Sequence, residues 1–360
     1  MSIWRWAERI SPVVEADRVT LGEGGTPVIR SRRIGPSAGL DRLFFKLETA
    51  NPTASYKDRF AAAAVSRMKA AGKTRCVATS SGNTGSALAA YCAAAGIECL
   101  IAIVEGAPDG KLQQMLAYGA QLYRVRGFGV DPAVSADTFR VIEALAAQPG
   151  SAIQISAYVY CPDGMTGVQT LSYELAEQFD TPIDHVFCPA GGGGMVVAVA
   201  RGFADLVRDG RLAVSPRVEC VQPAGNDTIA TPLRDGAAEA RTVTCTTRVS
   251  GLQVPNVLDG TLALQAARAS GGSGHVVSDE AVWETQARLA REEGLFCEPA
   301  AATALAGALQ AAREGRITRG ATVVCPITSS GFKDPPSVTR MLADRSCPVV
   351  DLTEFRRLLG

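Results

Sequence analysis

Histidine is scarce in this sequence, which contains only His185 and His275 among its 360 residues. Zinc enzymes and serine hydrolases usually need histidine as a metal ligand or as a general base. The ten cysteines are scattered through mostly apolar stretches, and no two of them are spaced Cys-x-x-Cys. We therefore interpret the cysteines as buried thiols. The sequence predicts neither a metal site nor a hydrolase of these two classes.

Net charge is also absent, because 36 Lys and Arg residues balance 36 Asp and Glu residues. This balance removes the usual electrostatic reason to expect binding to nucleic acid or to an anionic membrane surface. No apolar run approaches the length of a membrane span, and residues 1–6 lack the apolar core of a signal peptide. We therefore expect a cytoplasmic protein whose partners are small soluble molecules.

Aromatic residues make up only 6% of the chain, whereas hydrophobic residues together make up 47%. Ala, Val and Leu must then fill most of the core, and the length of the chain favours two domains. Short apolar runs alternate with amphipathic segments, a pattern typical of parallel sheets covered by helices. The predicted strands are residues 43–47, 76–79, 99–104, 121–125, 153–156, 185–188, 217–221 and 322–327. The predicted helices are residues 55–71, 86–95, 111–118, 133–147, 167–178, 195–204, 280–293 and 299–312.

Lys57 lies in residues 51–60, where a turn opens directly onto an alanine-rich helix. A lysine used as a covalent amine must lie where its charge is poorly solvated, so that it can form a Schiff base with a carbonyl group. Taken alone, the pattern fits better with a solvated lysine in a helix cap, with Ser55 or Asn51 as the capping side chain. The significance of Lys57 therefore depends on other parts of the chain.

Two loops that follow predicted strands are suited to anion binding. The first, residues 80–85, is rich in hydroxyl groups, an amide and free N–H donors. The second contains Gly191, Gly192, Gly193 and Gly194, which let the backbone approach a phosphate while the following helix N-terminus adds partial positive charge. A phosphate cradle, a donor-rich loop and one poised lysine together predict a site for pyridoxal 5'-phosphate.

With these motifs in place, the sequence resembles the threonine synthase family, within the fold type II (tryptophan synthase β-type) group of pyridoxal phosphate enzymes. The resemblance covers most of the chain, and its motifs follow the family's order. The matching blocks are residues 21–27, 51–60, 110–112, 117–120, 292–302 and 329–335. The resemblance implies a lyase or synthase that eliminates and replaces groups at Cβ or Cγ of an amino acid, with conversion of O-phosphohomoserine to threonine as the family reaction.

The resemblance also implies an α/β fold of two three-layer domains around mostly parallel sheets, with the cofactor in the cleft between the domains. The smaller, inserted domain is expected at residues 46–157. The larger, cofactor-binding domain is expected at residues 1–45 and 158–345, followed by a C-terminal tail helix at residues 346–360. A homodimer is what the family implies.

Individual residues take roles from the same resemblance. Lys57 would hold the cofactor as a Schiff base and, once released, would take the Cα proton of the substrate. Asn83 would donate to the ring hydroxyl group of the cofactor, Gly191 to Gly194 would bind its phosphate, and Thr328 would meet its pyridine nitrogen. A helix cap is the alternative for Asn83, and a strand-ending turn residue is the alternative for Thr328. The substrate carboxylate would be bound by Ser80, Ser81 and Thr84.

Departures from the family pattern concern the substrate more than the cofactor. Two family stretches, Asn-Pro-Tyr-Arg and Gly-Gln-Lys-Thr, carry cations that help to seat a substrate phosphate, but residues 156–170 contain no arginine or lysine here. A doubly charged phosphate needs paired donors. O-phosphohomoserine is therefore expected as the substrate only if Lys111, Arg241 or Arg248 supplies the charge. Ser330 also stands where the family usually has histidine.

Other functions stay open at this point. Met195 after the glycine loop resembles the dehydratase branch, so the alternatives are a serine/threonine dehydratase or a β-replacement synthase acting on O-phosphoserine or a similar activated serine. Glu298 is open between a catalytic acid, a metal ligand and a helix cap. The non-enzymatic alternative is a cofactor-binding regulatory scaffold. A nucleotide-binding module is disfavoured because Val196 interrupts Gly-x-Gly-x-x-Gly and Arg67 replaces the first glycine of a P-loop.

Overall fold

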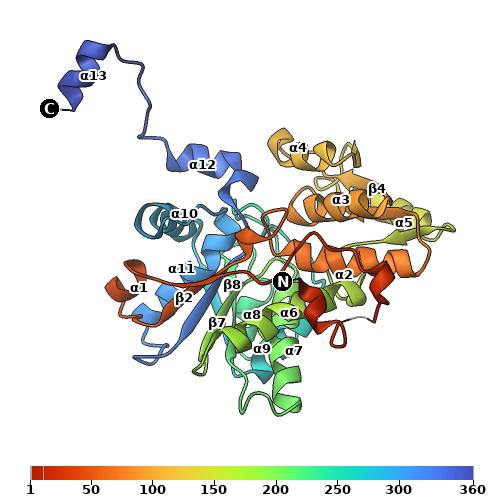
Figure 1. The fold of residues 1–360 in the computed structure, drawn as a ribbon, viewed down its shortest axis with the longest axis horizontal. Helices are drawn as coiled ribbons and strands as arrows, with labels where there is room; N and C mark the ends of the chain where they lie inside the picture. Colours follow the sequence, from red (N-terminus) through yellow and green to blue (C-terminus); the bar gives the residue numbers. More distant parts are fainter. Residues whose placement is uncertain (1, 11, 360) are drawn as a thin grey trace.

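The structure, a computed structural model, describes residues 2–10 and 12–359. It contains two sheets flanked by helices (Figure 1). The six-stranded sheet has the order β1 (Val28–Arg30), β2 (Leu43–Leu47), β10 (Val323–Ile327), β7 (His185–Pro189), β8 (Arg217–Pro223) and β9 (Gly274–Val277). The four-stranded sheet has the order β5 (Gln121–Arg124), β4 (Glu98–Ile103), β3 (Arg75–Thr79) and β6 (Ser151–Ile153). Neighbouring strands run parallel except for β1 and β2.

The helices connect these strands in the alternating order that a parallel sheet requires. The first group is α1 (Ile34–Ser37), α2 (Lys57–Ala70), α3 (Asn83–Ala95), α4 (Asp109–Ala117), α5 (Pro132–Ala146) and α6 (Pro162–Gln178). The second group is α7 (Gly194–Arg208), α8 (Ala230–Arg234), α9 (Gly260–Ala269), α10 (Asp279–Arg288), α11 (Pro299–Arg313), α12 (Pro335–Met341) and α13 (Leu352–Leu358). The predicted fold class, α/β with mostly parallel sheets, is confirmed.

The central strands carry apolar side chains on both faces because helices cover both sides of the sheet. Every residue of β7 and of β10 is buried. The helices that cover the sheets are rich in alanine, which explains how a core with so few aromatic residues is filled. In α11, for example, all residues from Pro299 to Leu309 are buried.

The path of the chain brings several loops to one place. The chain leaves the six-stranded sheet after β2, builds the four-stranded sheet from β3 to β6, and returns through α6 to β7. The four-stranded sheet thus lies within residues 46–157, the segment expected to be inserted, although the boundaries of the two domains stay a prediction. The loops after β2, β3, β7 and β10 all leave the carboxyl ends of their strands, where α/β proteins bind ligands.

Most of the predicted strands and helices are present, and the differences have physical reasons. Strands β1 and β9 have three and four residues and were not predicted, because such short runs show no clear period. Helices α1, α8, α9 and α12 were also missed. The helix predicted at residues 280–293 is α10 followed by a π-helical turn, Leu289–Glu293, which ends at Gly294 with φ 71°.

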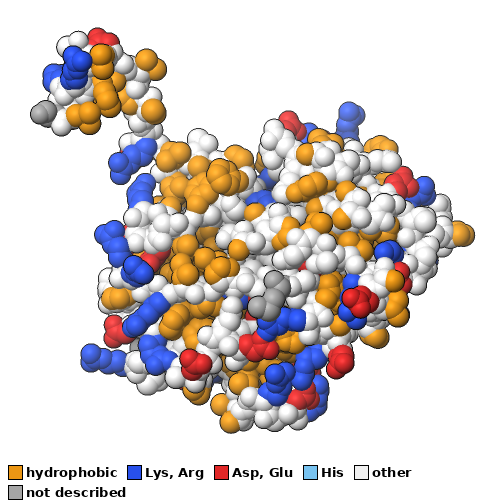
Figure 2. Space-filling view, viewed as in Figure 1, with side chains coloured by type: hydrophobic (Ala, Val, Ile, Leu, Met, Phe, Trp, Pro, Cys, Tyr) orange, Lys and Arg blue, Asp and Glu red, His pale blue; other side chains and the backbone are white. Residues whose placement is uncertain are grey.

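The C-terminal residues form an arm that projects from the body of the protein (Figure 1). Its helix α13 lies within the predicted tail helix, residues 346–360, of which Gly360 is outside the described residues. Hydrophobic side chains lie on this arm (Figure 2), and Leu352, Phe355 and Leu358 are exposed. Within the described part of the chain, no helix combines the length and the hydropathy needed to span a bilayer.

Candidate functional site

Lys57 is the first residue of α2 and follows the turn that its motif predicts. Its Nζ donates a hydrogen bond to Ser156 Oγ and lies 4.6 Å from the ring centroid of Tyr56. The turn before it contains Ala54 at φ 63°, a left-handed conformation that non-glycine residues rarely adopt. Lys57 is half-buried, and its amine is bound by a hydroxyl group. The side chain is therefore only partly exposed, while Ser55 Oγ accepts from Lys57 N at 3.3 Å, as in the helix-cap interpretation.

The lysine turn contacts the segment that follows β10. Tyr56 N donates to Thr328 O at 3.0 Å, and Ser55 forms an isolated bridge with Ser329. Ser330 N in turn donates to Ala54 O at 3.1 Å. These backbone contacts place buried Thr328 directly beside the start of α2. The lysine motif, residues 51–60, and the last motif, residues 329–335, are thus neighbours in space.

The glycine loop connects β7 to α7 and lies next to the partner of Lys57. Gly193 has φ 95°, and a Cβ atom there would come within 2.8 Å of Ala263 Cβ. A Cβ atom at Gly194 would meet Met165 Cε at 2.9 Å and Ser156 O at 3.4 Å. Position 193 is thus confined to glycine, whereas the flexible end of Met165 can give way at position 194. The N-terminus of α7 opens beside Ser156, where an anion would be stabilised.

Asn83 is the first residue of α3, and its side chain does not cap the helix, because Gly82 occupies the N-cap position. Its Nδ2 donates to Glu298 Oε1 at 2.9 Å, and its Oδ1 accepts from Ser329 Oγ at 3.3 Å. Burial raises the pKa of Glu298 to about 7. Glu298 is itself the N-cap residue of α11, but its carboxylate makes no capping bond. Asn83 therefore joins the four-stranded sheet to the last motif of the chain.

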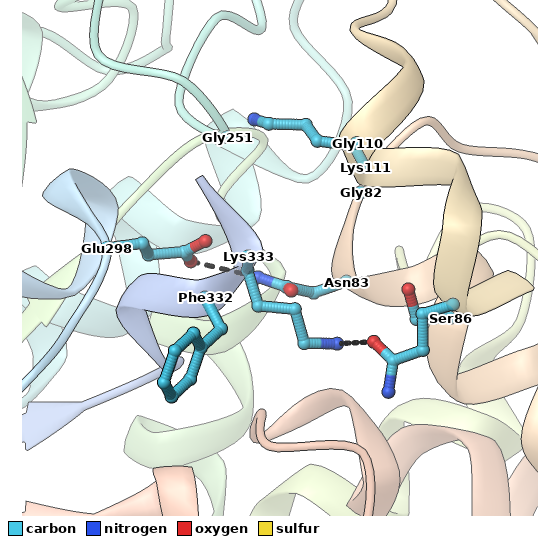
Figure 3. A pocket seen from close by; sticks show the side chains of 10 residues that line it. Gly82, Asn83, Ser86, Gly110, Lys111, Gly251, Glu298, Phe332 and Lys333 are labelled. Atoms are coloured by element: carbon cyan, nitrogen blue, oxygen red, sulfur yellow. Dashed lines mark hydrogen bonds between the residues drawn. The ribbon is translucent and has the colours of Figure 1, made fainter. Parts of the chain in front are cut away.

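A cavity of about 80 Å³ opens beside Asn83 and Glu298 (Figure 3). Two lysines line it. Lys111 Nζ donates to Ser250 Oγ and lies 3.2 Å from Asp334 Oδ1, whereas Lys333 Nζ donates to Gln114 Oε1 at 2.5 Å. The remaining lining residues are Gly82, Ser86, Gly110, Gln114, Gly251 and Phe332. Two lysines and Glu298 therefore border the cavity, and the charge of Lys111 is paired with the carboxylate of Asp334.

The structure brings several of the predicted residues together. Lys57 and Gly194 lie at Ser156, Thr328 lies beside the lysine turn, and Asn83 borders the cavity. Ser80, Ser81 and Thr84 belong to the loop and first turn that carry Asn83, but they lie outside the cavity lining, where Ser86 is found instead.

Several residues at the site were not singled out from the sequence. Ser156 was noted only as part of a departure from the family pattern, and Lys333 only as part of a motif. Asp259 gave no local signal, because its carboxylate accepts from Tyr158 N at 2.7 Å and Val159 N at 3.1 Å, a contact across about 100 residues. It fixes the segment that carries Ser156. Only the tertiary fold could reveal this role.

Behind Lys57, a fully buried ion network holds α2 in place. Arg59 Nε and Nη2 donate to Glu48 at 2.7 and 2.8 Å, and Nη1 and Nη2 donate to Glu174 at 2.7 and 2.8 Å. Lys46 Nζ donates to Glu174 Oε2 at 2.5 Å. Two cations thus balance two carboxylates. Because Arg59 is two residues after Lys57 on the same helix, the network fixes the start of α2.

The arrangement fits pyridoxal phosphate. A glycine cradle that excludes Cβ atoms precedes a helix N-terminus, and a half-buried lysine amine lies on the other side of Ser156. Such a cradle suits a phosphate group, and such an amine suits a carbonyl group. The residues present can therefore hold both ends of the cofactor.

Comparison with known proteins agrees with this geometry. Residues 19–329 match the protein family described as "Pyridoxal-phosphate dependent enzyme". A threonine synthase of Methanocaldococcus jannaschii is 32% identical over 362 residues, covering 100% of this chain and 87% of the relative.

Solved structures agree on the fold. A threonine deaminase from Solanum lycopersicum superposes with a TM-score of 0.74 at 17% identity, covering 96% of this chain and 94% of that chain. Maize serine racemase gives a TM-score of 0.71 at 24% identity, covering 99% and 95% of the two chains. The chain therefore belongs to the pyridoxal phosphate-dependent enzymes, as a threonine synthase-like lyase.

Proposed function

We propose that this enzyme eliminates and replaces a substituent at Cβ or Cγ of an amino acid, with O-phosphohomoserine as its substrate and threonine as its product. The observation that supports this proposal most is the cavity beside Asn83, which is lined by two lysines, Lys111 and Lys333. A substrate phosphate needs paired cationic donors, and residues 156–170 contain none. We infer that these two lysines supply the positive charges that residues 156–170 lack.

Lys111 is the stronger candidate among the three basic residues considered from the sequence. Arg241 is 60% exposed and lies 3.5 Å from Asp227. Arg248 lies over the ring of Trp283, 4.9 Å from its centroid, and its side chain is 64% exposed. Neither arginine lines the cavity, whereas Lys111 does. We therefore assign the phosphate contact to Lys111, with Lys333 as the second donor.

Residues around Ser156 are proposed to hold the cofactor. When bound, pyridoxal phosphate supplies the electron sink that weakens the bonds at Cα of an amino acid. Lys57 Nζ would attach to it covalently and, once displaced by the substrate amine, would take the Cα proton; Ser156 Oγ orients this amine in both roles. Gly191, Gly192, Gly193 and Gly194 would bind the phosphate.

Two further side chains would set the orientation and the protonation of the cofactor ring. Asn83 would donate to the ring hydroxyl group, for which its Nδ2 would leave Glu298. Thr328 would meet the pyridine nitrogen with a hydroxyl group, which does not force that nitrogen to stay protonated as an aspartate would. This favours elimination and replacement over transamination. The substrate carboxylate would be bound by Ser80, Ser81 and Thr84.

A second candidate function is dehydration of serine or threonine, or β-replacement on an activated serine. The glycine loop followed by Met195, which resembles the dehydratase branch, favours it. We test the two by titrating the cofactor-loaded enzyme with O-phosphohomoserine, O-phosphoserine, O-acetylserine, serine and threonine. Inorganic phosphate with threonine supports our proposal. A 2-oxo acid with ammonia means a dehydratase, and a substituted alanine means β-replacement.

The phosphate contact has its own test. Lys111→Met should raise KM for O-phosphohomoserine about ten- to hundredfold with a smaller effect on kcat, because a charge-assisted hydrogen bond contributes about 1.5–3 kcal/mol. Lys73→Met, on the turn after α2 and outside the cavity lining, is the matched control and should leave KM unchanged. Equal KM values for the two variants would show that Lys111 does not contact the substrate phosphate.

We also propose a cytoplasmic homodimer with domain boundaries near residues 46 and 157, as the family resemblance implies. Sedimentation of the cofactor-loaded enzyme gives the oligomeric state directly. A monomer at micromolar concentration would exclude a stable dimer.

A further inference from the structure

Three cysteines that are scattered in the sequence meet inside the four-stranded sheet. Cys76 on β3 and Cys99 on β4 are lateral partners in register, and Cys92 lies on α3, which contacts both strands. The three Sγ atoms all lie within 4.8 Å of one another. Cys76 and Cys92 are fully buried, and Cys99 is 6% exposed. Within the described residues, this is the one group of three potential metal ligands.

The spacing suits a single ion held by three sulfur atoms. With bonds of about 2.3 Å to one three-coordinate ion, three sulfur atoms lie about 4 Å apart around a planar ion and about 3.4 Å apart around a pyramidal one. The cysteines would therefore need to move together by at most about 1.5 Å. Structural zinc prefers four ligands, and no fourth Cys, His, Asp or Glu among residues 2–10 and 12–359 joins the group. The geometry thus favours an ion that accepts three ligands.

The apolar surroundings select the charge of the ion. The cluster lies in the same core as Ala78, Leu88 and Ile101, and a net charge buried in such a core is unfavourable. Three thiolates carry three negative charges. A trivalent ion makes the complex neutral, whereas Zn²⁺ leaves one negative charge and Cu⁺ leaves two.

We propose that Cys76, Cys92 and Cys99 form a binding site for a trivalent thiophilic metalloid of the arsenite class. Three As–O bonds of As(OH)₃ break and three As–S bonds form. The three thiol protons leave with the hydroxide groups as three water molecules, and arsenic stays trivalent. The site is separate from the cofactor pocket and does not depend on which amino acid the enzyme converts.

The cluster joins the two elements that flank the loop of Ser80 and Ser81. Cys76 lies on β3, which ends at Thr79, and Cys92 lies in the last turn of α3, at the opposite end of that helix from Asn83.

The test uses the full-length, cofactor-loaded enzyme, reduced with a phosphine and carrying Cys347→Ser, because Cys347 is an exposed thiol. After incubation with arsenite and desalting, we expect one arsenic per chain. X-ray absorption should show three sulfur neighbours and no oxygen neighbour. Zn²⁺ and Cu⁺ should bind more weakly, and tighter binding of either ion would overturn the charge argument.

Two sets of variants control the assignment. Cys92→Ala and Cys76→Ala should each lose stoichiometric arsenic. Cys220→Ala is the matched control, since Cys220 is a fully buried strand cysteine beside Cys188 in the other sheet, and it should keep one arsenic. The proposal fails if the parent binds no arsenic or if Cys92→Ala and Cys76→Ala both keep it. Loss of two hydrogens to a disulfide, in place of arsenic uptake, also overturns it.

Discussion

Arg59 offers the sharpest test of how the lysine helix is held. The side chain is fully buried and makes four hydrogen bonds to two carboxylates, while Lys46 supplies the second positive charge. Burial alone would raise the pKa of Glu174, but the charge of Arg59 lowers it to about 2. Arg59→Met removes one of the two cations and leaves Glu48 and Glu174 in the core with Lys46 alone.

We expect this substitution to reduce the free energy of unfolding by about 3–5 kcal/mol, the usual effect of removing one partner from a buried ion pair. That is a large part of the roughly 5–15 kcal/mol that stabilises a typical domain. The assay is urea unfolding of the enzyme at saturating cofactor, followed by circular dichroism at pH 7. Adding Glu48→Gln to Arg59→Met restores the charge balance and should recover part of the loss.

The pH dependence provides a second readout. Because the folded pKa of Glu174 is lower than its ordinary value of 4.5, the stabilisation is complete above that pH and is lost as the pH falls toward 2. The difference between wild type and Arg59→Met should therefore shrink in acid.

The control is Arg75→Met. It removes a pair with Glu98 at 2.6 Å whose side chains are 40% and 35% exposed, so it should change stability by less than about 1 kcal/mol. Equal losses of unfolding free energy in Arg59→Met and Arg75→Met would show that burial of the Arg59 ion pairs does not set their contribution to stability.

Three further predictions concern the cofactor site. Gly193→Ala should lower the affinity for the cofactor, measured by its absorbance after dialysis, because the new Cβ atom would meet Ala263 Cβ at 2.8 Å; Gly210→Ala, where no atom lies within 4 Å of a Cβ, tests for a general effect of losing a positive-φ glycine. Burial raises the pKa of Glu298 to about 7, so the folded protein keeps a proton that the unfolded chain releases near 4.5. The free energy of unfolding should therefore fall as the pH rises from 4.5 to about 7. In urea unfolding at a series of pH values, Glu298→Gln should remove the part of that fall that is due to Glu298. An unchanged dependence of the unfolding free energy on pH would contradict the raised pKa of Glu298. Ser156→Ala should lower kcat and shift its pH profile, whereas Ser135→Ala, on exposed α5, should do neither.

The sequence was sufficient for features with a local pattern. The strands that became β7 and β10 are continuous apolar runs, and Lys57, Asn83 and the glycine loop belong to motifs with specific turn chemistry. Their convergence is now visible in contacts such as Tyr56 N to Thr328 O and Asn83 Nδ2 to Glu298 Oε1. Their catalytic roles stay predictions.

Features set by tertiary contacts could not be predicted in the same way. Asp259 precedes α9 but makes no capping bond, since its carboxylate binds the amides of Tyr158 and Val159. Cys76, Cys92 and Cys99 show no motif spacing in the sequence, because they lie on a strand, on the following helix and on the next strand. Lys333 lines the cavity because the last motif of the chain lies opposite α4. Its Nζ donates to Gln114 Oε1 on that helix.

The central claim is that Lys57, among the six lysines of the chain, carries the cofactor. The direct measurement is reduction of the cofactor-loaded enzyme with borohydride, followed by proteolysis and mass spectrometry. We expect one pyridoxyl-phosphate group per chain on Lys57, and loss of that group in Lys57→Ala. Labelling of another lysine, such as Lys46, Lys111 or Lys333, or no labelling of the wild-type enzyme, would contradict it.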